Sequence, residues 1–75
     1  MKPEELYNKL QSGIEVYLLD DFEEAAIRLY VDNGQTKSYI KHHGHNEIEI
    51  PQSNETVCDI ILGGNEISKS EYDRY

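Results

Sequence analysis

Three histidines stand within residues 42–45, in the order His-His-Gly-His, and imidazole is a common ligand of zinc and nickel. On a strand, His43 and His45 would share one face, where two imidazoles could begin a metal site. A complete site needs further ligands, such as Cys58, and no second ligand pair lies at short spacing. We therefore expect no metal site, with His43 and His45 as its weak candidates. Exposed histidines in a turn, or a pH-sensitive contact, are the alternatives.

Catalytic chemistry has little support in the sequence. Cys58 stands among apolar residues, where a thiol is usually an inert part of the core, and no base is placed near it by spacing. Gly63 and Gly64 are not followed by a basic residue at the distance that a phosphate-binding loop needs. Carboxylates are plentiful, but a chain this short offers little depth for a pocket that would raise a carboxyl pKa. We expect a protein that is not an enzyme and has no cofactor.

The charge of the chain is strongly negative and unevenly placed. Asp and Glu number 15 against 7 Lys and Arg, for a net charge of −8. Segments 15–24 and 47–66 contain no Lys or Arg, whereas segment 35–46 contains lysines and histidines but no acid. Direct binding to nucleic acid or to an anionic membrane is disfavoured, because both depend on basic side chains. The acids indicate either ordinary solubility or a negative face for a basic partner.

The binding interpretation names particular residues. On a strand, Glu47 and Glu49 would project from one face roughly 6.6 Å apart, close to the spacing of phosphates along an extended nucleic-acid backbone. Aromatic anchors would supply most of the binding energy, and charge would select the partner and raise the association rate. We expect a protein partner with a basic surface, such as a nucleic-acid-binding complex. The candidate contact residues are Asp20, Asp21, Glu23, Glu24, Tyr30, Tyr39, Glu47 and Glu49.

The length of 75 residues allows one domain, residues 1–75, with a small core. Hydrophobic residues make up 37% of the chain, and no apolar run approaches the ~20 residues that span a bilayer. A single cysteine excludes an internal disulfide and is typical of a reducing compartment. We therefore expect a cytoplasmic protein, present as a monomer or a homodimer.

The first half of the chain predicts a helix, a strand and a hairpin. Pro3 and two following glutamates favour a helix start, and Leu6 and Leu10 share a face, so a helix is expected over about 3–11, ended by Gly13. Alternation predicts a strand over 14–19.

Residues 20–34 fit either a helix or a strand. We favour a hairpin with strands at about 25–32 and 36–43, because Asn33-Gly34 between alternating runs is a strong turn signal. The register would then set Arg28 opposite Tyr39 and Tyr30 opposite Lys37.

The second half predicts a short strand and two helices. Residues 46–50 alternate, with Ile48 and Ile50 expected inward, before Pro51. A helix over about 54–62 is preferred to a buried strand, with Gly63 as a left-handed stop. Residues 68–71 form a capping box for a helix over 68–75. The expected fold is α+β: a helix, a four-stranded antiparallel meander, then two short helices on one sheet face.

Residues 64–73 resemble the C-terminal tails of many short phage and bacterial proteins. The whole chain, tiny, acidic and without a catalytic motif, is similar to small phage-encoded inhibitors of host defence, such as anti-CRISPR proteins. That resemblance implies a non-enzymatic inhibitor acting in the host cytoplasm, and it assigns no role to any particular residue. The alternative is a structural or regulatory subunit that self-associates or docks on a larger protein through an exposed sheet edge.

Overall fold

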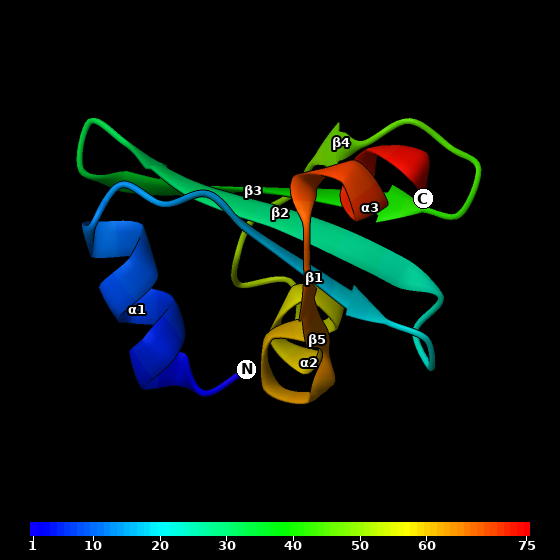
Figure 1. Ribbon diagram of the computed structural model, residues 1–75, viewed down its shortest axis with the longest axis horizontal. Helices are drawn as coiled ribbons and strands as arrows, with labels where there is room; N and C mark the ends of the chain where they lie inside the picture. Colours follow the sequence, from blue (N-terminus) through cyan, green and yellow to red (C-terminus); the bar gives the residue numbers. More distant parts are fainter.

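The computed structural model describes residues 1–75 as an antiparallel sheet with helices on both sides (Figure 1). The strands lie in the order β4-β3-β2-β1-β5, and each pairs antiparallel with its neighbours. The expected α+β class is confirmed, with five strands where four were expected. The elements are α1 (Pro3–Gln11), β1 (Val16–Asp20), β2 (Ala25–Asp32), β3 (Gln35–His42), β4 (Ile48–Glu49), α2 (Glu55–Gly63), β5 (Asn65–Ile67) and α3 (Lys69–Arg74).

The β2–β3 hairpin has the register that the Asn-Gly turn predicted. Asn33 and Gly34 both have positive φ, 51° and 77°, which matches the twist of a two-residue turn to that of the strands. Arg28 therefore pairs with Tyr39, and Tyr30 pairs with Lys37. The helical alternative for residues 20–34 is wrong, because alternate side chains along β2 enter the core on one face of the sheet.

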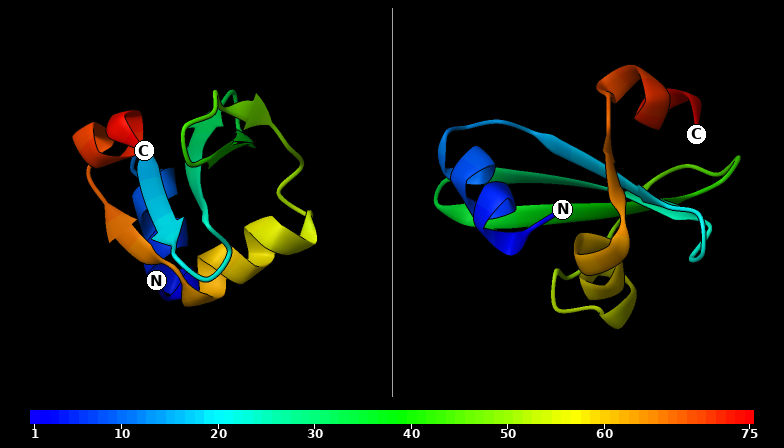
Figure 2. Two further views of the ribbon diagram at one scale, coloured as in Figure 1. Left: turned by 90° about the vertical axis from the view of Figure 1, so that its right-hand side faces the viewer. Right: turned by 60° about the horizontal axis from the view of Figure 1, so that its bottom comes forward.

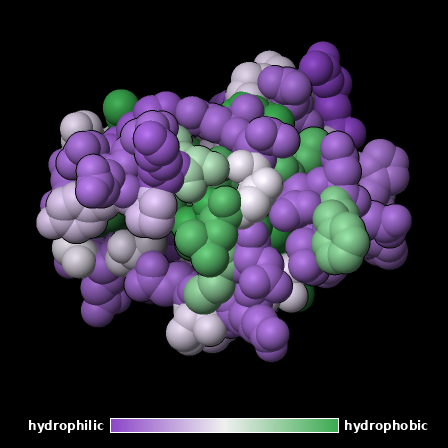
Figure 3. Space-filling model, turned by 90° about the horizontal axis from the view of Figure 1, so that it is seen from below, coloured by the Kyte–Doolittle hydropathy of each residue, from purple (hydrophilic) through white to green (hydrophobic).

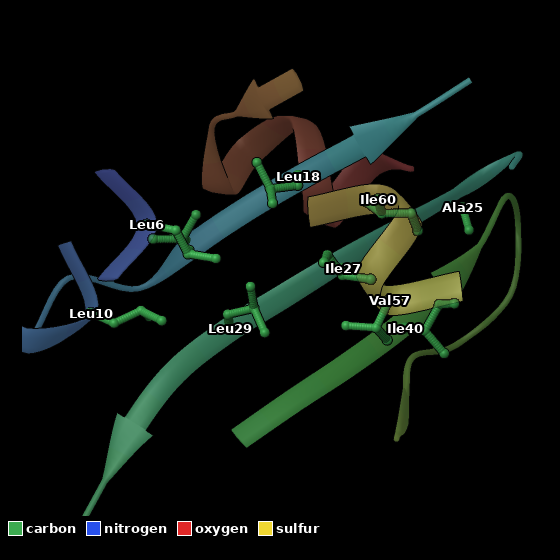
Figure 4. Close-up of a cluster of buried hydrophobic side chains, with 10 residues drawn as sticks. Leu6, Leu10, Leu18, Ala25, Ile27, Leu29, Ile40, Val57 and Ile60 are labelled. Carbon is green, nitrogen blue, oxygen red and sulfur yellow. The ribbon is translucent and has the colours of Figure 1, made fainter. Parts of the chain in front are cut away.

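One face of the sheet, the core face, packs against α1 and α2. Leu6 and Leu10 reach the sheet from α1, and Val57 and Ile60 reach it from α2 (Figure 4). They cover side chains that are almost completely excluded from solvent, and burial of each Val, Leu or Ile among them contributes about 1.5–3 kcal/mol to folding. The sheet residues of this core are Val16, Leu18, Ala25, Ile27, Leu29 and Ile40.

The opposite face, which we call the tyrosine face, carries Tyr17, Arg28, Tyr30, Tyr39 and Lys41. Helix α3 covers part of it, on the other side of the sheet from α1 and α2 (Figure 1). The expectation that both C-terminal helices share one sheet face is therefore wrong. Strand β5 is the reason, because it pairs with β1 and carries the chain past the sheet edge.

Side chains cap the starts of both α2 and α3, and the capping box of α3 is as the sequence predicted. Asn54 accepts hydrogen bonds from two amides of α2, and Ser68 and Glu71 form the reciprocal capping box of α3. The stop at Gly63 is wrong, since Gly63 is the last helical residue and Gly64 caps the helix with an extended φ of −82°. Gly64 is required because a Cβ there would lie 2.6 Å from the backbone oxygen of Ile60.

Strand β4 is shorter and more exposed than the alternation of residues 46–50 predicted. Ile48 pairs with Ile40 at the end of the sheet but is 61% exposed, so its expected inward position is wrong. Ile50 lies beyond the strand and packs against the core. Cys58 is also exposed rather than buried, because it lies on the outer side of α2. None of the helices is long and apolar enough to cross a membrane.

Candidate functional site

A groove of about 440 Å³ lies on the tyrosine face, between α3 and the segment that leads into β4. In the left view of Figure 2, α3 lies at the upper left and β4 at the upper right, with strands of the sheet between them. Strands β1, β2 and β3 form the floor because their alternate side chains point to this face. The groove is lined by Glu15, Tyr17, Arg28, Lys41, Asn46, Glu47, Lys69, Tyr72 and Asp73.

Arg28, at the centre of β2, organises this groove. Its Nε and Nη2 donate to the two carboxylate oxygens of Glu47, at 3.1 and 2.7 Å, and its Nη1 lies 3.4 Å from Glu15. The two-pronged contact fixes the plane of the guanidinium. It also holds the pKa of Glu47 below its ordinary value and raises the pKa of Arg28. Both groups therefore keep their charge inside a partly shielded groove.

Two tyrosines complete the network. The hydroxyl of Tyr72 donates to Glu47 at 2.7 Å, and the hydroxyl of Tyr17 donates to Glu15. Their rings pack at 5.2 Å between centroids, so α3 is fastened to β1 by both polar and aromatic contacts. Burial, followed by the bonded carboxylate, raises the pKa of Tyr17 to about 12 and raises that of Tyr72 as well.

The remaining charges of the groove also have partners. Lys41 donates to the backbone oxygens of Tyr72 and Asp73 at 2.8 and 3.0 Å, where the dipole of α3 favours a cation. Lys69 pairs with Asp73 at 2.9 Å along the same helix. The lining contains three carboxylates and three cations, which balance one another. The contacts of Lys41, Glu47 and Tyr17 with α3 hold this helix against the sheet.

Beside the groove, Tyr30 and Tyr39 form an aromatic stack on the same face. Their rings are nearly parallel, at 5°, with centroids 6.2 Å apart. The guanidinium of Arg28 lies over Tyr39 at 4.3 Å and within 5.2 Å of Tyr30. Because Glu47 holds Arg28 in place beside the two rings, we expect the motion of these half-exposed tyrosines to be restricted. Tyrosine and arginine are frequent at the centres of protein interfaces.

The first acidic segment forms the turn between β1 and β2. Asp20 is half-buried, and its Oδ1 accepts the backbone N–H of Phe22 at 2.9 Å and that of Glu23 at 3.3 Å. Asp21 and Glu24 are exposed, and neither is in an ion pair within the chain. This turn therefore presents uncompensated negative charge at one end of the molecule.

The predicted contact residues occupy three places rather than one continuous face. Asp20, Asp21, Glu23 and Glu24 lie in the β1–β2 turn, Tyr30 and Tyr39 lie in the stack, and Glu49 is exposed on β4. Glu47 does not project freely, since it precedes β4 and is paired with Arg28.

Sequence reasoning missed the groove. The cross-strand pairing of Arg28 with Tyr39 is the signal that could have pointed to it. The side of the sheet taken by Tyr72, which completes the groove, depends on β5.

The histidines do not gather with other ligands. No group of three or more His, Cys, Asp or Glu side chains is arranged to hold a metal ion. His43 and His45 are exposed in the turn between β3 and β4, and the ring of His43 packs edge-on against Tyr75 at 5.0 Å. Gly44 donates its N–H to the backbone oxygen of Tyr75 at 2.9 Å. The β3–β4 turn therefore holds Tyr75, the residue that follows α3.

Among solved structures, the chain is similar to a chain in the crystal structure of the complex between the Type VI effector Tas1 and its immunity protein. The two are 26% identical with a TM-score of 0.67, and the match covers 79% of this chain and 78% of the other. Because these shares are nearly equal, the two chains have nearly equal lengths. No protein-family model matches the sequence, and no curated protein matches it.

Proposed function

We propose that this chain is a small protein-binding inhibitor of the immunity-protein kind, which acts by occupying a surface of its partner. The observation that carries the proposal is the likeness to a chain in an effector–immunity complex over most of both chains. A shared fold alone does not define a function, so the proposal also depends on the chemistry of this chain's surface.

The proposed action is binding without catalysis. The charged groups of the groove satisfy one another, with Glu47 bound by Arg28 and Tyr72, and Lys69 bound by Asp73. A catalytic acid or base needs a proton that it can exchange with a substrate, whereas the hydrogen bonds from Arg28 and Tyr72 lower the pKa of Glu47 and favour its charged form. This pairing supports a structural role for the groove.

The proposed partner carries a basic surface. The uncompensated carboxylates of the β1–β2 turn and Glu49 would attract it, and the stacked pair of Tyr30 and Tyr39 would supply contact area with little loss of side-chain freedom. That this partner handles nucleic acid, and that the chain acts as anti-CRISPR proteins do, are further predictions.

Docking through a sheet edge is the competing idea. The outermost strands, β4 and β5, have two and three residues, and short edge strands offer few backbone groups to another chain. Strand β4 pairs only with Tyr39 and Ile40 of the eight-residue β3, so the outer edge of β3 near the β2–β3 turn is where such docking would occur.

The proposal is tested by affinity capture of a partner with the tagged chain from extracts of the source organism, at 50 mM and 500 mM salt. We expect a defined protein that is retained at low salt and lost at high salt, because exposed charge pairs are screened. Capture that is indifferent to salt would remove the electrostatic part of the proposal. A chain that retains no partner at either salt would remove the proposal itself.

A further inference from the structure

Phe22 is the most exposed of the five exposed large hydrophobic residues, all of which lie outside both core clusters. It is the only phenylalanine of the chain and is 92% exposed, more than any other large hydrophobic residue. An apolar spot enclosed by hydrophilic atoms is visible at the end of the molecule where the β1–β2 turn lies (Figure 3). Burial of a phenylalanine is favourable, yet this ring contributes nothing to either core cluster.

The turn holds Phe22 in a defined position before any partner arrives. The carboxylate of Asp20 accepts the N–H of Phe22, and the N–H of Glu24 donates to the backbone oxygen of Asp21 at 3.3 Å. Glu24 has a left-handed φ of 54°, which only a well-determined turn tolerates in a residue other than glycine. Such a turn fixes the backbone at Phe22, so the main chain here loses little conformational freedom on binding.

The charges around the ring indicate which kind of surface can bind it. Asp21 and Glu24 flank the turn, both are exposed, and neither is in an ion pair within the chain, so the ring is surrounded by uncompensated negative charge. An anionic membrane surface would be repelled by these carboxylates. A second copy of the same turn would be repelled too, since its own acids would meet them. A protein surface with lysine or arginine around an apolar pocket is the complement that remains.

We propose that Phe22 is the anchor by which this chain docks into an apolar pocket, rimmed by lysine or arginine, on its protein partner. The inference rests on the proposed function and adds the point of contact. Binding would be concentrated at the ring, and the carboxylates around it would orient the approach. Tyr30 and Tyr39 on the sheet would then form a second, separate contact with the partner.

Photo-crosslinking locates the contact directly. One variant carries Phe22→p-benzoylphenylalanine, and a matched control carries Leu62→p-benzoylphenylalanine at another exposed apolar position, on α2 and 68% exposed. We expect an adduct with the partner from position 22 and none from position 62. Mass spectrometry should place the adduct at apolar residues with lysine or arginine beside them. An adduct from position 62 alone, or one in an acidic segment of the partner, would overturn the inference.

Affinity for the purified partner gives the second measurement. Phe22→Ala should weaken binding at least about 10-fold, as anchor residues do, while Leu62→Ala changes it less than about 2-fold. Both variants should fold, because both side chains are exposed. If wild type binds and Phe22→Ala binds equally well, the anchor is wrong and the proposed function stands. If wild type binds no partner, the proposed function and the anchor both fail.

Discussion

Arg28 and Glu47 are joined by two hydrogen bonds, of 3.1 and 2.7 Å, which connect the centre of β2 to the segment before β4. The same carboxylate accepts the hydroxyl of Tyr72, so a single side chain links β2, the β4 segment and α3. One of the carboxylates predicted to meet a partner, Glu47, thus has a structural task. We therefore expect loss of Glu47 to weaken the fold and loss of Glu49, which is exposed, to leave it nearly unchanged.

Glu47→Ala should destabilise the protein by about 2 kcal/mol, because Arg28 and Tyr72 would be left without their acceptor in a partly shielded groove. Glu49→Ala removes the same charge from an exposed position and should change the free energy of unfolding by less than about 0.5 kcal/mol. Urea denaturation at pH 7 compares the two variants. Equal losses would show that the Arg28–Glu47 contact contributes nothing particular to the fold.

Acid should remove the stabilising contribution of Glu47. Arg28 keeps the pKa of Glu47 in the folded chain below its ordinary value of 4.5, whereas the unfolded chain takes up a proton near that value. The contribution is therefore complete above pH 4.5 and is lost as the pH falls through the pKa of the folded state. Unfolding measured from pH 7 to pH 3 should show the difference between wild type and Glu47→Gln narrowing only below about pH 4.5. A constant difference across that range would contradict the assignment.

Alkali should act on the two tyrosines of the groove. The pKa of Tyr17 is raised to about 12 from 10.0, so its hydroxyl stays protonated in the folded chain after the unfolded chain has ionised. The contribution of Tyr17 to the free energy of unfolding is therefore fully present below pH 10 and is lost as the pH rises toward 12. Tyrosinate absorbance at 295 nm should show that some tyrosines of the wild type ionise well above pH 10. The Tyr17→Phe variant should have one such tyrosine fewer. Simultaneous titration of all six tyrosines of the native chain would refute this.

The neighbouring glycines at the end of α2 make a matched pair. Gly64→Ala places a Cβ 2.6 Å from the oxygen of Ile60 and 3.1 Å from that of Leu19, both backbone atoms, and should cost about 1–3 kcal/mol. Gly63→Ala meets only a side-chain oxygen of Asp20 at 3.5 Å and should stabilise the helix by up to about 1 kcal/mol. In thermal unfolding, Gly63→Ala should have the highest midpoint temperature, wild type an intermediate one and Gly64→Ala the lowest. The reverse order would contradict the described packing.

Local signals in the sequence predicted local structure well. The Asn33-Gly34 turn determined the register of β2 and β3, and with it the contact between Arg28 and Tyr39. The capping box formed by Ser68 and Glu71 predicted the start of α3. In each case the interacting groups are separated by few residues, so the chain itself constrains the geometry.

The side of the sheet on which α3 lies depends on non-local packing. Strand β5 has three residues, of which Asn65 and Glu66 are exposed, so neither hydrophobic alternation nor length distinguishes it from a loop. Its pairing with β1 places Ile67 opposite Tyr17 and carries Tyr72 to the tyrosine face. The groove follows from that pairing, and a sequence pattern alone does not reveal it.

Charge reversal separates binding from folding. Asp21→Lys with Glu24→Lys should weaken capture of the partner at least about 10-fold at low salt, because it inverts the field around the β1–β2 turn. The matched control, Glu55→Lys with Asp59→Lys, makes the same change in net charge at exposed positions on α2. Circular dichroism should show both variants folded. Equal weakening by the two pairs would mean that net charge, rather than this turn, governs binding.

Stoichiometric inhibition is the most direct test of the central claim. The purified partner is titrated with the chain while its own activity and the heat of binding are both followed. The proposed function predicts one binding event and a loss of activity that is complete near equimolar chain, with no chemical change in either protein by mass spectrometry. Binding that leaves the activity intact, or inhibition by trace amounts of chain accompanied by covalent change in the partner, would contradict it.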